Sequence, residues 1–243
     1  MMSRDDGLRL RERIWYSRTM TKTPQYFYTS DTHIGHRLVA RERGFVFPDR
    51  EPELDQRTGL YLPVPDTGAH DRALALHWDT TVRPQDFVFV LGDISISGSD
   101  YALEWHMNRP GTLVLITGNH DDPWGFNRDA YKEFEKWSMV FRGGIFPFLR
   151  RKLGGHYFLM SHFPYSGTGS EGHGAEERHN QFRLPDMGTK LIHGHTHDQD
   201  QRAHVSDSGT PQLHVGLDAW DQKLLHQDTI QGWLENPDST FFQ

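Results

Sequence analysis

Short apolar runs recur along the chain and are separated by longer polar stretches. Runs of this length, bounded by Gly, Pro, Asp or Ser, are typical of strands that are buried on both faces. They predict strands at residues 26–29, 87–91, 113–117, 157–160, 191–192 and 213–215.

Helical patterns lie between and after the first three predicted strands. We expect helices at residues 71–82, 100–108 and 129–137, the first followed by Pro84 and the second by Pro110 and Gly111, which end helices. Alternating strands and helices predict a parallel sheet with right-handed crossovers. The closer strands of the second half predict a mixed sheet. The expected fold is α/β, with two packed sheets and helices outside.

Two stretches have the composition of loops. Residues 45–68 contain four prolines, and residues 165–183 are rich in Gly, Ser and charged side chains. Loops this long in a compact domain are usually functional or disordered, and the sequence leaves their role open. We expect one domain over residues 24–243, preceded by an N-terminal extension over residues 1–23 that lacks the apolar core of a signal peptide.

Composition excludes several classes of function. The 243-residue chain has no cysteine, so any metal must be held by nitrogen and oxygen ligands. No run approaches the ~20 apolar residues of a membrane span. The net charge of -7 disfavours stable binding of long nucleic acid, which normally needs a basic surface. Together with the lack of cysteine, these features are consistent with a cytoplasmic protein.

Metal-ligating side chains follow five of the predicted strands directly. Because the carboxyl ends of strands in an α/β sheet meet where ligands bind, these side chains are expected to converge. Residues two apart on an extended chain point the same way, so each Asp-x-His or His-x-His pair can hold one site. Carboxylate, imidazole and amide donors together suit Mn, Fe, Zn or Ni. The candidate ligands are Asp31, His33, Asp93, Asn119, His162, His195 and His197, and His120 and Asp121 follow Asn119 directly.

Five motifs stand in this order: Asp31-x-His33, Gly92-Asp93, Gly118-Asn119-His120-Asp121, Ser161-His162 and Gly194-His195-x-His197. The set resembles the motifs of the calcineurin-like metallophosphoesterase superfamily, and the resemblance covers about residues 26–234. The sequences of residues 30–36 (Ser-Asp-Thr-His-Ile-Gly-His) and 215–220 (Val-Gly-Leu-Asp-Ala-Trp) are similar to those of a small bacterial and phage branch of this superfamily. The resemblance implies a four-layer αββα sandwich of two mixed sheets with a dinuclear metal site. The loops at 45–68 and 165–183 are less typical of the family.

The resemblance also implies roles for the motif residues. One metal ion would be held by Asp31, His33, Asp93 and His197. Asp93 would bridge to a second ion, which is held also by Asn119, His162 and His195. His120 corresponds to the general acid beside the leaving group, and Asp121 would orient it. Two divalent ions are expected, Mn²⁺ first, with Fe, Zn and Ni as alternatives.

These residues predict hydrolysis of a phosphate ester. Two ions ~3.5–4 Å apart activate a bridging hydroxide, which attacks phosphorus in line with the leaving oxygen, and His120 protonates that oxygen. We expect a phosphodiesterase for small or cyclic nucleotides. The alternatives are a phosphomonoesterase or protein phosphatase, a nuclease of the same superfamily, and a non-catalytic scaffold. His36, Arg178 and Arg183 are candidates for substrate contacts, although the composition of the loop around the two arginines favours a solvated charged loop. The oligomeric state stays open.

Overall fold

The computed structural model describes residues 23–96, 98–165, 179–200 and 202–237, so all but the last residue of the expected N-terminal extension lies outside the described ranges. Two five-stranded sheets and the helices that flank them form the mixed α/β fold that the sequence predicts. In the first sheet, the strand at residues 225–226 is antiparallel to its neighbour, and the other four strands are parallel to one another. Its order is β12 (Leu225–His226), β1 (Tyr26–Thr29), β4 (Phe87–Val90), β5 (Thr112–Ile116) and β6 (Ile145–Phe146).

The second sheet is mixed, as the closer spacing of its strands predicts. Its three central strands are parallel, and one antiparallel strand pairs with them at each edge. The sheet contains five strands in the order β10 (Ala203–Val205), β11 (Pro211–His214), β9 (Leu191–His193), β8 (His156–Ser161) and β7 (Phe148–Leu153).

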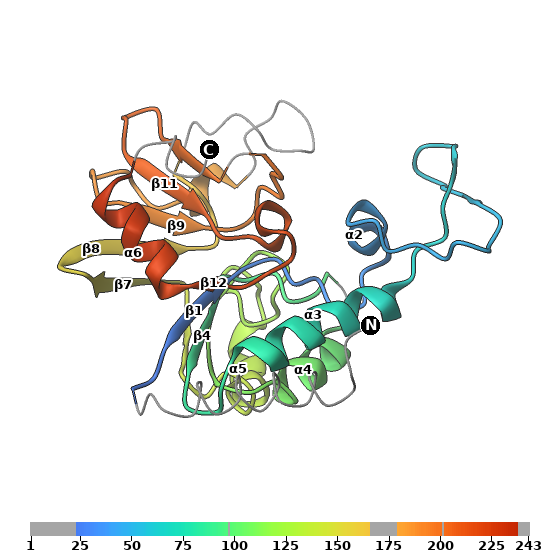
Figure 1. Ribbon diagram of the computed structural model, residues 1–243, viewed down its shortest axis with the longest axis horizontal. Helices are drawn as coiled ribbons and strands as arrows, with labels where there is room; N and C mark the ends of the chain where they lie inside the picture. The colour runs from blue at the N-terminus through green and yellow to red at the C-terminus, as the bar shows by residue number, and fades with distance from the viewer. Residues whose placement is uncertain (1–22, 97, 166–178, 201, 238–243) are drawn as a thin grey trace, which may run out of the picture.

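Three helices connect the parallel strands of the first sheet and cover its outer face (Figure 1). They are α3 (Thr67–Thr81), α4 (Ser99–Met107) and α5 (Ala130–Ser138). The first begins earlier than residue 71, where the apolar pattern starts, because the Asp66 carboxylate accepts the Ala69 amide at 2.8 Å and caps the helix. A last helix, α6 (Gln227–Glu235), follows β12. Of the helices in the described part of the chain, none is long and apolar enough to cross a bilayer.

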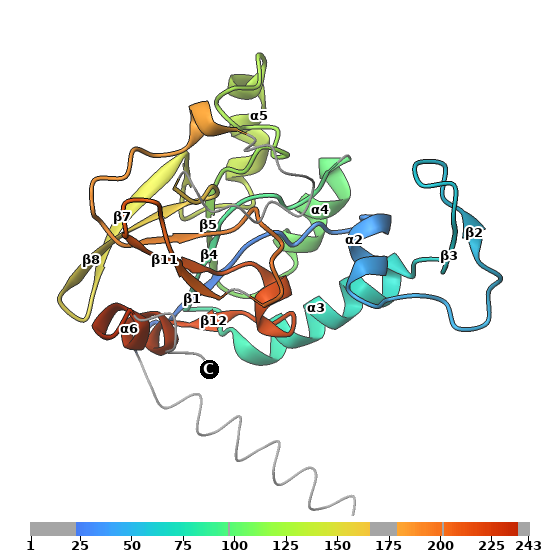
Figure 2. The ribbon, with the colours of Figure 1, turned by 90° about the horizontal axis from the view of Figure 1, so that it is seen from above.

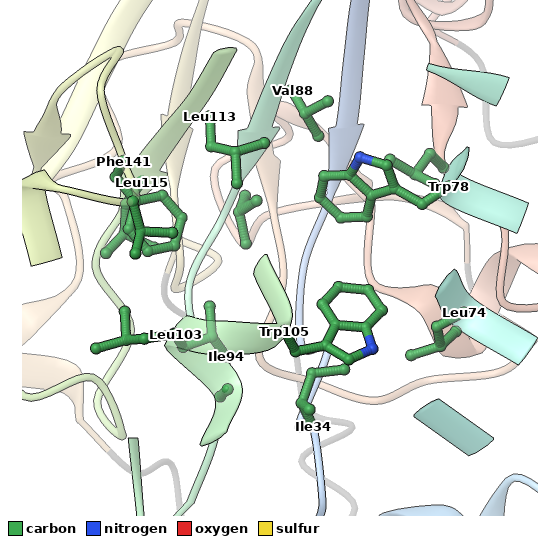
Figure 3. Close-up of a cluster of buried hydrophobic side chains, with 14 of the residues drawn as sticks. Ile34, Leu74, Trp78, Val88, Ile94, Leu103, Trp105, Leu113, Leu115 and Phe141 are labelled. Atoms are coloured by element: carbon green, nitrogen blue, oxygen red, sulfur yellow. The ribbon is translucent and has the colours of Figure 1, made fainter. Parts of the chain in front are cut away.

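The first sheet is buried on both faces, which explains its uninterrupted apolar runs. Successive side chains of a strand point to opposite faces, so Val88 packs toward the helices and Phe89 toward the second sheet. On the helix side, Trp78 of α3 and Trp105 of α4 meet edge to face at 5.8 Å (Figure 3). On the other side, aromatic and aliphatic side chains of both sheets form a second core with Trp233 of α6.

The segment 45–68 contains structure where the sequence predicts a loop. After α2 (Arg37–Glu42), the strands β2 (Glu53–Leu54) and β3 (Tyr61–Leu62) form an antiparallel hairpin that stands apart from the body of the molecule (Figures 1 and 2). An ion pair of 2.8 Å between Arg41 and Asp55 ties the hairpin to α2. Strands of two residues are too short to show a periodic pattern, which is why the sequence did not reveal them.

Candidate metal centre

The loops that follow β1, β4, β5, β8 and β9 meet at one edge of the two sheets. Backbone hydrogen bonds join them: the Asp31 amide donates to the Gly92 carbonyl at 3.0 Å, and the Gly194 amide donates to the His162 carbonyl at 3.0 Å. The convergence follows from the parallel register of each set of strands. It brings the predicted ligands together in two groups.

The first group consists of Asp31, His33 and His197, whose ligand atoms all lie within 4.8 Å of one another. The Nε2 atoms of the two imidazoles are 3.1 Å apart and lie 3.9 and 3.7 Å from Asp31 Oδ1. That carboxylate oxygen is buried and accepts no hydrogen bond from the residues that the structure describes. A buried, unpaired carboxylate oxygen is costly, and it faces two ring nitrogens that can also act as donors to a cation.

The second group consists of Asp93, His162 and His195. His162 Nε2 lies 3.4 Å from Asp93 Oδ2 and 3.2 Å from His195 Nδ1. In the neutral ring, His162 Nδ1–H donates to the Leu91 carbonyl at 2.7 Å, which leaves Nε2 with its lone pair toward the group. Asn119, which follows β5, has a buried Oδ1 without a hydrogen-bond partner among the described residues.

The two groups form one site. The His195 amide of the second group donates to Asp31 Oδ2 of the first at 3.0 Å. His120 lies between them, with its ring 6.1 Å from the His33 ring and its Nε2 4.0 Å from Asp93 Oδ2. Nitrogen and oxygen donors with one carboxylate in each group fit divalent transition metals. In the first group, a bound cation would also stabilise the unpaired Asp31 Oδ1.

Residues two apart are expected from the sequence to point the same way because the chain is extended. This expectation is wrong, because the backbone at these ligands is not extended. All four members of the two Asp-x-His and His-x-His pairs have a positive φ, from 44° at His33 to 71° at His195. The same conformation recurs at Asp93, with φ 55°. The left-handed region is uncommon for residues other than glycine and is concentrated at functional sites. The pairs converge because the chain turns sharply after each strand.

A carboxylate and a guanidinium outside the first group form hydrogen bonds to its residues. His197 Nδ1 lies 2.9 Å from Asp218 Oδ2, and Arg43 donates to both oxygens of Asp218 at 2.8 Å. Arg43 also donates to the Asp31 carbonyl at 2.7 Å. Asp218 belongs to the 215–220 stretch that carries the family resemblance, but the sequence did not indicate its contact, and nothing in the sequence singled out Arg43.

His120 and Asp121 have different surroundings. The His120 side chain is 40% exposed, whereas Asp121 is fully buried. The Asp121 carboxylate accepts the amides of Asp93, Ile94 and Gly118 at 2.8–3.1 Å. Among the hydrogen bonds of the described residues, none joins it to the His120 imidazole. Asp121 therefore holds the two loops together, and its expected role in orienting the His120 ring stays a prediction.

The predicted substrate residues lie at different places. The His36 ring is 6.0 Å from the His33 ring, and its Nδ1 accepts the Val39 amide at the start of α2. Arg183 is buried, and its guanidinium donates to the Tyr165 carbonyl at 2.9 Å. Arg178 lies outside the described residues.

Burial and neighbouring charges give the imidazoles of the site different pKa values. Burial, reinforced by the neighbouring His197, lowers the pKa of His33 well below its usual range, and burial with His162 does the same for His195. Burial acts in the same direction at His162, but there the Asp93 carboxylate outweighs it and raises the pKa to about 10. Without metal, a proton on His162 therefore takes the place of a cation beside Asp93.

Comparison with known proteins confirms the predicted family. The model of the calcineurin-like phosphoesterase family matches residues 26–199, more than half of the chain, and the chain belongs to this family. Membership implies hydrolysis of phosphate esters and binding of divalent metal ions.

Two phage proteins and one crystal structure are similar to the chain. It is 39% identical over 214 residues to the gene 66 protein of Mycobacterium phage L5, covering 84% of this chain and 91% of that protein. For the gene 66 protein of Mycobacterium phage D29 the identity is 41% over 212 residues, with coverages of 84% and 93%. A protein of unknown function from Aquifex aeolicus has a similar fold, with a TM-score of 0.55, 17% identity, and coverage of 86% of this chain and 98% of that one.

Proposed function

We propose that this chain is a two-metal phosphodiesterase that acts on small phosphate diesters, with nucleotides or cyclic nucleotides as the preferred class. The observation that carries the proposal is the pair of buried donor groups in one site, each with three ligand atoms within 4.8 Å of one another. The half-exposed His120 imidazole lies beside the second group, where a substrate in contact with the ions can also reach it.

The ligand assignment follows the two groups. Asp31, His33 and His197 would hold one ion, and His162, His195 and Asn119 the other. Asp93 has one oxygen 3.4 Å from His162 Nε2 and accepts the His120 amide on its other oxygen. We propose that it would bridge the ions, as the family resemblance implies. Mn²⁺ is the ion we expect first, because the donor set mixes hard carboxylates with imidazoles.

In this proposal the side chains divide the chemical work. Bound ions supply a nucleophile at neutral pH, because coordination lowers the pKa of water to ~7. His120 is exposed enough to reach the leaving oxygen and protonates it as the ester bond breaks. The Asp121 carboxylate accepts the backbone amides of Asp93 and Gly118, and so fixes the position of the loop that carries His120. His36 and Arg183 are kept as candidate substrate contacts.

The preference for small diesters rests on charge and resemblance. Proteins bind long nucleic acids largely through basic side chains that displace counterions from the phosphates. The net charge of -7 therefore disfavours a nuclease. The site chemistry is shared with monoesterases, so substrate profiling must separate the two.

A direct test measures metal content and turnover together. The protein is purified with Mn²⁺, its bound metal is quantified, and an aryl phosphodiester is assayed beside the matching monoester before and after chelation. We expect about two ions per chain, faster turnover of the diester, and loss of activity on chelation that added Mn²⁺ restores. The variant Asp93→Asn should lose both metal and activity.

Asp221→Asn is the matched control, because Asp221 is exposed and has the same left-handed backbone as Asp93, with φ 50°. It should keep metal and turnover. A monoester hydrolysed far faster would identify a phosphomonoesterase, and rapid cleavage of long nucleic acid would identify a nuclease. Full metal content without turnover of any ester would indicate a scaffold.

A further inference from the structure

A continuous set of aromatic rings extends from the second donor group toward the solvent. It comprises Trp124, Phe126, Phe163, His179 and Phe182, and we call it the aromatic wall. It begins at Phe163, whose ring lies 4.8 Å from the His195 ring and 5.0 Å from the His162 ring. Trp124 continues it at 6.1 Å from Phe163, and Phe182 packs edge to face on Trp124 at 4.8 Å.

Exposure rises along the aromatic wall. Phe163 is 3% exposed, Trp124 and Phe182 are half-buried, and Phe126 is 62% exposed. A single exposed aromatic residue needs no explanation, but this one is continuous with rings that touch two candidate metal ligands. An apolar surface that opens beside a polar, metal-ligating site has the composition of a ligand pocket.

The aromatic wall is held in place by the loops that carry the catalytic site. The Trp124 amide donates to the Asp121 carbonyl at 3.0 Å, and the Asn127 side chain donates to the same carbonyl at 3.0 Å. From the other side, the rings of Phe126 and Phe182 lie 3.9 Å apart. Phe182 ends the short helical turn η1 (Asn180–Phe182). A surface fixed in this way loses little conformational freedom when a ligand binds.

We propose that the aromatic wall stacks a planar aromatic group of the substrate, a nucleobase or an aryl ring, while the phosphate of the same molecule lies at the metal centre. The proposal rests on the proposed function and names the residues that select the group next to the phosphate. Every base has a π-face, so stacking on Trp124, Phe126 and Phe182 selects for a ring without selecting among bases. The rings of Trp124, Phe126 and Phe182 add no positive charge, so they complement the ions instead of competing with them for the phosphate.

Two matched diesters test the proposal: the methyl ester of adenosine 5′-monophosphate and the methyl ester of ribose 5-phosphate. They have the same charge and the same reacting bonds, and only the first has a base. We expect kcat/KM to favour the base-bearing ester by about tenfold or more, as stacking on aromatic side chains predicts. Phe126→Ala should remove most of that preference through KM, whereas Phe126→Tyr should retain it.

Tyr157→Ala is the control, because Tyr157 is 54% exposed and lies at the opposite end of β8 from His162. Calorimetric binding of adenosine 5′-monophosphate and ribose 5-phosphate to the Mn²⁺-loaded protein gives the same comparison without turnover. Hydrolysis of both esters at equal kcat/KM, or a preference that survives Phe126→Ala, would overturn the inference and leave the proposed function intact. If neither ester is hydrolysed but the base-bearing phosphate binds more tightly through Phe126, the diesterase proposal fails and the aromatic wall stands.

Discussion

The Asp218 carboxylate accepts a hydrogen bond from His197 Nδ1–H at 2.9 Å, although 21 residues separate the two in the chain. Arg43 holds both oxygens of the same carboxylate. Burial opposes the charge of Asp218, but the Arg43 guanidinium outweighs it and keeps the pKa of this carboxyl well below its usual range. The charged carboxylate fixes the tautomer of His197, so the Nε2 lone pair is directed at Asp31 and His33.

Asp218→Asn should therefore weaken metal binding at the first group. The neutral amide no longer strengthens His197 as a ligand, and supporting residues of this kind typically change metal affinity by about 10–100-fold. Titration of the metal-free protein with Mn²⁺ should show one site weakened and the other retained. Asp207→Asn, in an exposed turn, is the control. Unchanged affinity at both sites, in a variant that unfolds at the wild-type temperature without metal, would contradict the role of Asp218.

His120→Ala should lower kcat without lowering the metal content. The His120 side chain is 40% exposed and is not in either ligand group, so its removal leaves the donors in place. A general acid typically contributes about 10²–10⁴-fold, and the loss should be largest for esters with a poor leaving group, such as an alkoxide. Comparing alkyl and aryl diesters in the variant measures this dependence. An equal loss on both would argue against proton donation. His156→Ala, at the far end of β8, provides the control.

Metal binding should release a proton from His162. The pKa of this ring is raised to about 10 in the metal-free protein, so it is protonated near neutral pH and the proton must leave before a cation can bind. Affinity should rise about tenfold per pH unit as pH increases toward that pKa, if one proton is exchanged. His33 and His195, whose pKa values are lowered by burial, are already neutral and add no such dependence. Burial also acts to lower the pKa of His197, but the Asp218 carboxylate outweighs it and raises that pKa, so any proton on His197 is released in the same direction. Calorimetry in buffers of different ionisation enthalpy counts the protons released. A pH-independent affinity would refute the exchange.

Gly194→Ala should damage the site through sterics alone. A Cβ at this position would lie 1.8 Å from Ser30 Oγ and 2.5 Å from Asp31 Oδ2, so the first group would have to move. We expect reduced metal content and a loss of stability of about 1–3 kcal/mol, typical of overpacking. Thermal unfolding and metal analysis measure the two effects. Gly125→Ala has nothing within 4 Å of the new Cβ and should behave as wild type. Normal metal content in Gly194→Ala would show that the loops around Asp31 are less constrained than the contacts indicate.

The sequence alone predicted the inner strands of both sheets and proposed the candidate ligand residues. Strands that are buried on both faces must be apolar throughout, so β1, β4 and β5 appear as apolar runs at nearly their observed bounds. The polar residues that follow such runs stand out for the same reason. The sequence did not predict the edge strands β6, β7, β10 and β12, because their patterns are short or half-exposed and lack an apolar run.

Only the tertiary structure decided how those residues are arranged. The left-handed turns that pair Asp31 with His33 depend on contacts between loops, and a local pattern of residue types does not record them. The ion pair of Arg43 and Asp218 joins residues 175 apart, and the aromatic wall joins residues after β5 with residues after β8. Such contacts form when folding places separate segments side by side and excludes water from between them. The sequence thus determined which chemical groups are available, and the packing of the two sheets determined which of them meet.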